Sequence, residues 1–263
     1  MIKALYTAAT GMKTQQVNVD VIANNLANVN TSGFKRSQAD FQDLLYIILQ
    51  APGAETAEGR QSPTGIEIGS GARLVSTTKV FTQGVLEPTG RKLDVAIQGE
   101  GFYEVELPDG SIAYTRDGAF RRDANGELVT PEGYPLKNNI TIPRDVASEN
   151  INFGVDGTVS YTDLQGTQAT AGTIELVRFP NPSGLKSLGG NLFAETVASG
   201  QAVRGKPGED GLGGLLPANL ERSNVEVVNE MVNLIVAQRA YEVNSRAIRT
   251  GDQMLSISTS LTR

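Results

Sequence analysis

The stretch "VIANNLANVNTSGFK", residues 21 to 35, begins with the apolar spacing of a helix and ends as a turn. Its apolar part runs to Leu26, while four asparagines between Asn24 and Asn30 lower the helix propensity. Gly33 suits the left-handed conformation that commonly ends a helix. The stretch therefore predicts that a long N-terminal helix stops here.

Apolar residues recur every seven positions before this turn. One set of positions holds Ile2, Ala9, Gln16 and Ala23, and the other holds Leu5, Met12, Val19 and Leu26. Only Gln16 among them is polar. A sustained seven-residue apolar repeat is typical of a helix that packs along another helix.

The C-terminal segment has the same period. One set of positions holds Val227, Leu234, Tyr241, Ile248 and Leu255. A second set is mostly polar and holds Met231, Gln238, Ser245, Asp252 and Thr259. The pattern allows two interpretations, because the terminal helices can form a hairpin within one chain or a stalk whose polar positions meet other copies.

Glycine and proline separate these ends from the middle of the chain. All 11 prolines and all but three of the 29 glycines lie between Tyr46 and Arg222. Both residue types disfavour helix interiors. Short β-prone runs from about Lys79 to Phe193 alternate with turn formers such as Pro-Asp-Gly and Ala-Asn-Gly. We therefore predict an antiparallel β domain.

The segment from Tyr46 to Arg73 lacks a sustained apolar period and is longer than the usual connection in a compact domain. Alternation around Ile66 and Ile68 favours a strand, and Pro52 and Pro63 favour bends. We predict an extended, hairpin-like arm.

Together these elements predict an α+β fold class. Long N- and C-terminal helices would form a coiled-coil-like stalk, with a central antiparallel all-β domain and the arm. We place the discontinuous stalk domain at residues 1–45 and 223–263, the arm or linker at 46–78, and the outer β domain at 79–222.

Composition excludes several functional classes. The chain contains no cysteine and no histidine, so thiolate metal sites, cysteine nucleophiles and the commonest general base are absent. A net charge of -6 without a basic patch argues against nucleic-acid binding. No segment has the apolar length of a membrane span, and the start does not resemble a signal peptide. We expect no enzyme activity, no cofactor, no metal site and no membrane insertion.

Three long segments carry a family resemblance. They read "IANNLANVNTSGFKR", "TGRKLDVAIQGEGFYEVELPDGSIAYTRDGAFRRDANGELVTPEGYPL" and "LERSNVEVVNEMVNLIVAQRAYEVNSRAIRTGDQML". The chain resembles the axial rod and hook family of the bacterial flagellum over nearly its whole length. The length and residues 46–73 most resemble members that form the distal rod, although Tyr46–Leu49 is more apolar than expected there.

The resemblance implies a structural subunit of the flagellar distal rod that self-assembles helically into a rigid hollow drive shaft and transmits torque from motor to hook. The implied partners are further copies in an open helical assembly, proximal rod and hook proteins, the peptidoglycan and outer-membrane ring proteins, and the flagellar type III export apparatus. The implied location is the basal body, where the rod crosses the periplasm after export without a cleaved signal peptide. Another axial protein, such as a proximal rod or hook subunit, and a secreted binding module are the alternatives.

We expect the subunit interface on the helices and on the turn after the first helix. On the first helix and its turn, the expected residues are Ile2, Leu5, Met12, Val19, Asn24, Asn25, Leu26, Asn28, Asn30, Gly33 and Phe34. On the C-terminal helix they are Val227, Met231, Leu234, Gln238, Tyr241, Asn244, Ile248 and Leu255. The asparagines would either cap a fraying helix end or, as a group, form hydrogen bonds between subunits. The arm residues Tyr46, Pro52, Pro63, Ile66 and Ile68 would lie against adjacent copies and stiffen the assembly.

Overall fold

The computed structural model describes residues 2–52, 55–57, 60, 61, 63–138, 140–163 and 165–261. Helix α1 spans Ile2–Ala27 and helix α2 spans Val227–Leu261. The strands between them are β1 (Ser37–Asp43), β2 (Ile47–Gln50), β3 (Glu55–Ala57), β4 (Arg60–Gln61), β5 (Ile66–Ile68), β6 (Ala72–Lys79), β7 (Leu86–Pro88), β8 (Val95–Gln98), β9 (Phe102–Glu106), β10 (Ile112–Thr115), β11 (Arg121–Arg122), β12 (Leu128–Val129), β13 (Ile151–Phe153), β14 (Thr158–Thr162), β15 (Gln168–Thr173), β16 (Leu176–Arg178), β17 (Lys186–Gly189), β18 (Leu192–Ala194), β19 (Val203–Gly205), β20 (Gly214–Pro217) and β21 (Asn219–Glu221).

The chain divides into two compact units. The first, here called the helical unit, comprises Met1–Leu26, Ser37–Thr78 and Val227–Arg263. The second, here called the β unit, comprises Ala27–Arg36 and Lys79–Glu226. The chain therefore enters and leaves the β unit more than once.

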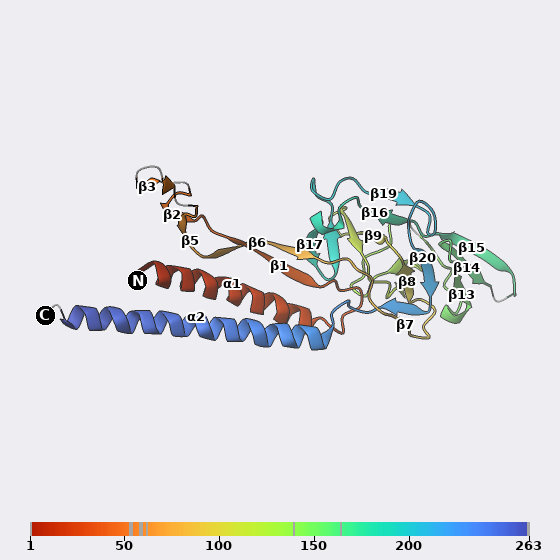
Figure 1. The fold of residues 1–263 in the computed structure, drawn as a ribbon. Helices are drawn as coiled ribbons and strands as arrows, with labels where there is room; N and C mark the ends of the chain where they lie inside the picture. Colours follow the sequence, from red (N-terminus) through yellow and green to blue (C-terminus); the bar gives the residue numbers. More distant parts are fainter. Residues whose placement is uncertain are drawn as a thin grey trace. The chain divides into compact units, whose positions relative to one another are not determined.

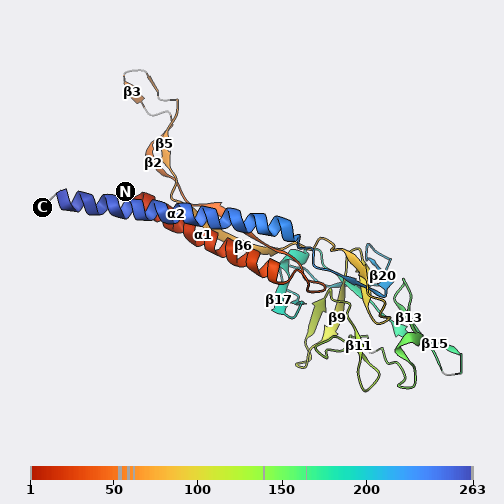
Figure 2. The same cartoon turned by 90° about the horizontal axis from the view of Figure 1, so that it is seen from below.

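In the helical unit, α1 and α2 lie side by side and run in opposite directions (Figures 1 and 2). The contact between them includes two glycines. A Cβ atom on Gly11 would lie 2.9 Å from the amide nitrogen of Asn244, and one on Gly251 would lie 2.6 Å from a methyl carbon of Leu5. The two helices thus meet where a side chain on one faces a glycine on the other.

The prediction of a coiled-coil-like stalk is wrong. The predicted α+β class agrees in part, because one helix precedes and one follows the β-rich middle of the chain. A coiled coil buries apolar side chains at two seam positions of each helix. In α1 the seam residues Ala9, Gln16 and Ala23 are exposed, and in α2 Met231 and Gln238 are exposed. The seven-residue spacing identified apolar positions, but glycine and polar residues such as Gly11 and Asn244 share the contact between the helices with side chains such as Leu5, and several seam residues stay exposed.

The described residues between 37 and 79 form a two-stranded ribbon in which β1 pairs with β6, and β2 with β5 and β3 with β4 in antiparallel pairs. Ile47 is opposite Ile68 in the β2–β5 pair. Between the β1–β6 and β2–β5 pairs, the Leu44 amide donates a hydrogen bond of 2.8 Å to the Gly71 carbonyl. Gly71 also packs directly against Thr10 of α1, where a Cβ atom would lie 2.1 Å from the threonine hydroxyl oxygen.

The β unit is built on a six-stranded antiparallel sheet with the order β17-β18-β10-β9-β16-β19. Both faces of this sheet are covered. Tyr103 and Val105 of β9 belong to a large buried cluster, while Phe102 belongs to a second, aromatic cluster with Phe179 and Phe193. The rings of Phe102 and Phe179 meet edge to face, 5.8 Å apart. Side chains on the two faces of β9 therefore belong to two different cores.

Smaller sheets complete the β unit. These are the β11–β12, β8–β20 and β7–β21 pairs and the three-stranded β13–β14–β15 sheet. Strand β8 is almost fully buried, and its neighbour Asp94 forms a β-bridge with Ala119. The loop that contains Gly118 thus lies directly against the backbone of β8.

Gly118→Ala should destabilise the β unit by about 3 kcal/mol, because overpacking of a close contact costs this order of free energy. A Cβ atom on Gly118 would lie 1.7 Å from the carbonyl oxygen of Val95. The free energy of unfolding from urea titration measures the effect. Gly110→Ala is the matched control, because Gly110 has open space around it and its positive φ of 77° costs about 1–2 kcal/mol. Equal losses for the two variants would contradict the packing argument.

Candidate assembly interface

The turn after α1 depends on Gly33. The helix ends at Ala27, so Gly33 lies beyond the helix end, but it has the expected left-handed conformation with φ of 69°. Its amide donates a hydrogen bond of 2.8 Å to the Glu221 carbonyl, and a Cβ atom would lie 2.8 Å from the Asp117 amide nitrogen. Only glycine combines this φ with so close an approach.

Two residues further on, Lys35 enters a buried network of charges. Its ammonium group lies 2.6 Å from one carboxylate oxygen of Glu221, and the Nε of Arg116 lies 2.7 Å from the other. The Lys35 and Glu221 side chains are each 1% exposed. Lys35 also donates to the Thr82 carbonyl at 2.7 Å, and the Gly84 amide donates to Glu221 at 2.8 Å.

Arg116 brings the network a second positive charge. Its guanidinium group also donates to the carbonyls of Gly101 and Gly99. Burial lowers the pKa of Lys35 from its usual value, and the nearby Glu221 carboxylate opposes this shift. One carboxylate therefore compensates two buried cations that come from distant parts of the β unit.

Phe34 and Asn30 are held within the same unit. Phe34 is buried, and the ammonium group of Lys79 lies 4.8 Å from the centre of its ring. Asn30 is exposed, and its side-chain oxygen accepts a hydrogen bond of 3.1 Å from Arg222. Asn28 is half-buried, and its side-chain oxygen accepts a bond of 3.2 Å from Thr31.

In the helical unit, Asn25 is 1% exposed and fully engaged. Its amide group exchanges two hydrogen bonds of 2.8 Å with the backbone of Ser37, and its nitrogen lies 3.4 Å from a carboxylate oxygen of Glu230. Asn24 is exposed on the same helix. The structure therefore gives Asn25 partners within the chain and leaves Asn24 at the surface.

The other expected interface residues divide by exposure. Leu5, Met12, Val19, Leu26, Leu234, Asn244, Ile248 and Leu255 are half-buried. Val227, Met231, Gln238 and Tyr241 are exposed. Leu5 and Asn244 lie in the contact between the helices, and the side chain of Ile2 lies outside the described residues.

The arm residues are all exposed. Ile66 and Ile68 lie on β5, and Tyr46, Pro52 and Pro63 lie in the turns around the β2–β5 pair. The neighbouring run Leu45–Leu49 is exposed throughout. Large apolar side chains thus cover the outer half of the described ribbon.

A polar cavity of about 290 Å³ lies beside the Gly33 turn and is lined by Asn28, Asp117 and Glu132, among others. Burial raises the pKa of Asp117 to about 6, although its carboxylate accepts a hydrogen bond from the Ala119 amide. The carboxylates of Asp94 and Glu132 raise this pKa further. The ionised form of Asp117 is therefore electrostatically unfavourable in the folded protein at neutral pH.

The described residues show no group of three or more acidic side chains placed to hold a metal ion. In the same part of the chain, neither helix is long and apolar enough to cross a membrane.

The sequence did not predict the network of Lys35, Arg116 and Glu221. Lys35 and Glu221 are 186 positions apart, and opposite charges at that separation leave no periodic signal. The one available indication was that all three lie inside the segments that carry the family resemblance.

Sequence comparisons identify three matching family profiles. The family described as "Flagella basal body rod protein" matches residues 5–35. The "Flagellar hook protein FlgE/F/G D1 domain" matches residues 96–161, and the "Flagellar basal body rod FlgEFG protein C-terminal" family matches residues 217–261.

Full-length relatives agree with these matches. The flagellar basal-body rod protein FlgG of Borreliella burgdorferi is 48% identical over all of both chains. The protein of the same name from Buchnera aphidicola is 50% identical over 97% of this chain and 98% of its own. The flagellar hook-basal body complex protein FlhP of Bacillus subtilis is 34% identical over 99% of this chain and all of its own.

Glu221→Gln should destabilise the β unit by about 3–5 kcal/mol, because it leaves two buried cations without a counterion. Glu87→Gln is the matched control. Glu87 forms a 3.0 Å ion pair with Arg222 in which both side chains are about half exposed, and such a pair contributes at most about 1 kcal/mol. Urea titration at neutral pH compares the two variants. A loss for Glu221→Gln as small as that of the control would contradict the role of the network.

Asp117→Asn should stabilise the protein at pH 7 by about 1–3 kcal/mol. Because the folded-state pKa of Asp117 is raised, the folded protein binds the proton more tightly than the unfolded chain does. Proton binding therefore stabilises the fold fully below about pH 4, and this stabilisation is lost as the pH rises through 6. The variant should remove this pH dependence, measured as the free energy of unfolding from pH 4 to 7. Asp145→Asn, which removes an exposed carboxylate, should leave the dependence unchanged.

Proposed function

The chain belongs to the FlgG family of flagellar basal-body rod proteins and is a structural subunit of the flagellar distal rod, and we propose that its copies assemble helically into a stiff, hollow drive shaft. The family consists of structural rod proteins and is not a known enzyme family. The family resemblance predicted from the sequence is thus confirmed. In the proposed shaft, the subunit carries torque from the motor to the hook.

The exposed apolar surface of the helical unit carries this proposal. On α2, Val228 is 74% exposed and Val236 and Val243 are each 62% exposed. On the ribbon, Leu45 is 89% exposed. Exposed apolar surface on this scale marks an interaction site in a soluble protein. Its presence on two elements of one unit is expected of a subunit whose neighbours cover it.

The geometry of assembly follows from this surface. The apolar residues of α2 and those of the ribbon differ in sequence and structure, so a contact between them joins unlike surfaces. A contact between unlike surfaces that does not close into a ring produces a helical filament. We therefore propose an open assembly in which the ribbon of one copy lies against the helices of adjacent copies.

As a flagellar rod protein, the chain is part of the basal body and assembles with other rod and hook components. We propose that its direct partners are the proximal rod and hook proteins along the axis and the peptidoglycan and outer-membrane ring proteins around it. We also propose passage through the flagellar type III export apparatus into the periplasm. The absence of cysteine supports this route, because no thiol can cross-link in an oxidising compartment.

The ribbon can be tested as the stiffening element. Replacing residues 46–69 with Asn-Gly removes the exposed apolar residues beyond Leu45 and supplies a tight turn, while the β1–β6 pair and the Leu44–Gly71 hydrogen bond remain. Rods should still form but should bend more, because contacts that oppose sliding between neighbours are lost. Curvature in electron micrographs of isolated rods measures the effect.

A variant that keeps the whole ribbon but carries Leu45→Ser and Leu49→Ser separates apolar contact from ribbon length. Rods of this variant should bend more than unmodified rods and less than rods of the shortened variant. Rods of the shortened variant that stay as straight as the unmodified rods would contradict the stiffening role.

A further inference from the structure

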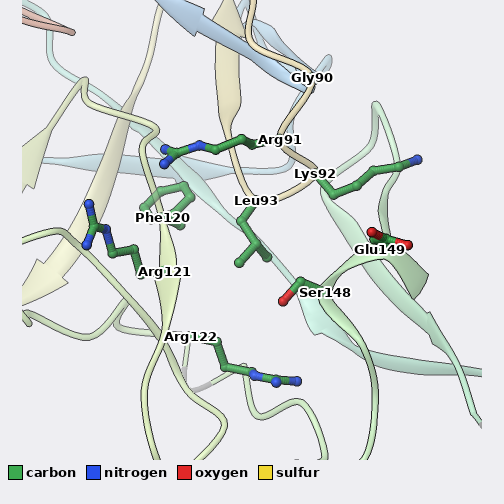
Figure 3. A pocket seen from close by; sticks show the side chains of 9 residues that line it. All are labelled: Gly90, Arg91, Lys92, Leu93, Phe120, Arg121, Arg122, Ser148 and Glu149. Atoms are coloured by element: carbon green, nitrogen blue, oxygen red, sulfur yellow. The ribbon is translucent and has the colours of Figure 1, made fainter.

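A groove with a positive charge lies in the β unit, at the start of β8. It has a volume of about 530 Å³ and is lined by Gly90, Arg91, Lys92, Leu93, Phe120, Arg121, Arg122, Ser148 and Glu149. Figure 3 shows Leu93 and Phe120 in the middle of this groove, with charged side chains around them. We call it the basic groove. An apolar floor with cations at its rim suits an acidic segment of protein.

One of the four cations of the basic groove is paired with a carboxylate, and the other three have no carboxylate partner among the described residues. Arg91 is paired with Asp94, with its Nε 2.9 Å from a carboxylate oxygen. Arg121 is exposed and forms no ion pair in the part of the chain that the structure describes. Lys92 is exposed, and its ammonium group lies 3.5 Å from the side-chain oxygen of Asn152.

The remaining charged residues of the groove leave it positive. Arg122 donates to the backbone carbonyls of Val146 and Pro143, so its charge has no carboxylate partner among the described residues. Glu149 is the one carboxylate in the lining. The groove is therefore a positive surface on a chain whose net charge is -6.

A negative surface lies at the other end of the same two-stranded ladder. Strand β8 pairs with β20 from Val95 opposite Pro217 to Gln98 opposite Gly214. The basic groove adjoins the Val95 end, because Asp94 bridges Ala119 and places the strand of Arg121 there.

The opposite end carries Glu100, Glu209 and Asp210, here called the acidic turn, and all three residues are exposed. The Gly213 amide donates to the Glu100 carbonyl at 2.7 Å, which holds this turn against the end of β8. The cations Lys206 and Arg178 lie nearby and reduce its charge without cancelling it. About six residues of extended chain, or roughly 20 Å, separate the acidic turn from the basic groove.

We propose that the basic groove of one copy receives the acidic turn of a second copy. This inference rests on the proposed self-assembly and specifies a contact between β units. Because the two surfaces differ and lie at opposite ends of one ladder, the contact joins copies head to tail, and it builds an open filament when the rotation between copies does not close a ring. Contact between unpaired surface charges is screened by salt, so it should weaken as ionic strength rises.

Disulfide cross-linking tests the contact directly, because the natural chain has no cysteine. Ser148→Cys lies in the basic groove and Glu209→Cys in the acidic turn, and this pair leaves Lys92 and Arg121 of the groove and Glu100 and Asp210 of the turn in place. Under mild oxidation, assembled chains that carry both substitutions should yield a ladder of dimers, trimers and higher species. Ser148→Cys with Gln168→Cys, an exposed position on β15, is the matched control and should yield no ladder.

Charge reversal provides the second arm. Ser148→Cys chains with Lys92→Glu and Arg121→Glu should cross-link about tenfold less to Glu209→Cys chains. Adding Glu100→Lys and Asp210→Lys to the Glu209→Cys chains should restore the yield, because the charges are again opposite. Reversal that changes nothing would overturn the proposal.

The remaining outcomes separate this contact from self-assembly itself. Rods that form while Ser148→Cys and Glu209→Cys fail to cross-link would overturn the proposed contact and leave the proposed function intact. Cross-linking of Ser148→Cys chains to one another in the absence of the second cysteine would also overturn it, because it would show like surfaces in contact. Unmodified protein that forms no assembly under any condition would contradict the proposed function.

Discussion

The β unit is organised around one buried carboxylate, whose lost hydration must be replaced by protein groups. Glu221 is buried between Lys35 and Arg116, and a buried charge is tolerated only when its partners and hydrogen bonds replace the lost water. Glu221 and its two partners come from three separate stretches of the chain, so the residues after α1, the loop after β10 and the last strand β21 must all be in place together. Hydrogen bonds from Lys35 and Arg116 to backbone carbonyls then fix the neighbouring loops. The network therefore links the two chain segments of the β unit, Ala27–Arg36 and Lys79–Glu226.

The helical unit follows a different rule. Between its helices, glycine faces a polar or apolar side chain, as at Gly11 with Asn244, and the amide of Asn25 is satisfied by Ser37. Apolar side chains such as Val228 and Val236 lie on the surface instead. The helical unit buries few large apolar side chains, such as Ile22, and exposes many others, although hydrophobic burial is the main favourable contribution to packing. The proposed contacts with neighbouring copies would cover this exposed apolar surface and so add to the stability of the unit.

Sequence patterns predicted some of these features and missed others for physical reasons. The left-handed conformation of Gly33 was predictable because local sterics decide it. The coiled-coil-like stalk was predicted wrongly because a seven-residue repeat reports which positions are apolar and does not report what covers them. The pairing of Lys35 with Glu221 was missed because it joins positions far apart in the sequence, and no local rule applies to such a pair. The arm's role as a stiffening element and the contacts between copies stay predictions.

The two units supply interactions of different range, and this difference has a consequence for a drive shaft. Apolar contacts on the helical unit are short-ranged and grow with buried area, so they suit tight packing of helices between neighbours. Charged surfaces at the two ends of the β8–β20 ladder act over about 10 Å at moderate ionic strength and select orientation before contact. A subunit with both kinds of surface can be oriented by its charges and then held by its apolar side chains. The apolar run Leu45–Leu49 lies exposed on a narrow ribbon, and we propose that it lies against adjacent copies. In that proposal each ribbon contact resists sliding in proportion to the apolar area it buries, so the ribbon adds to the stiffness of the shaft.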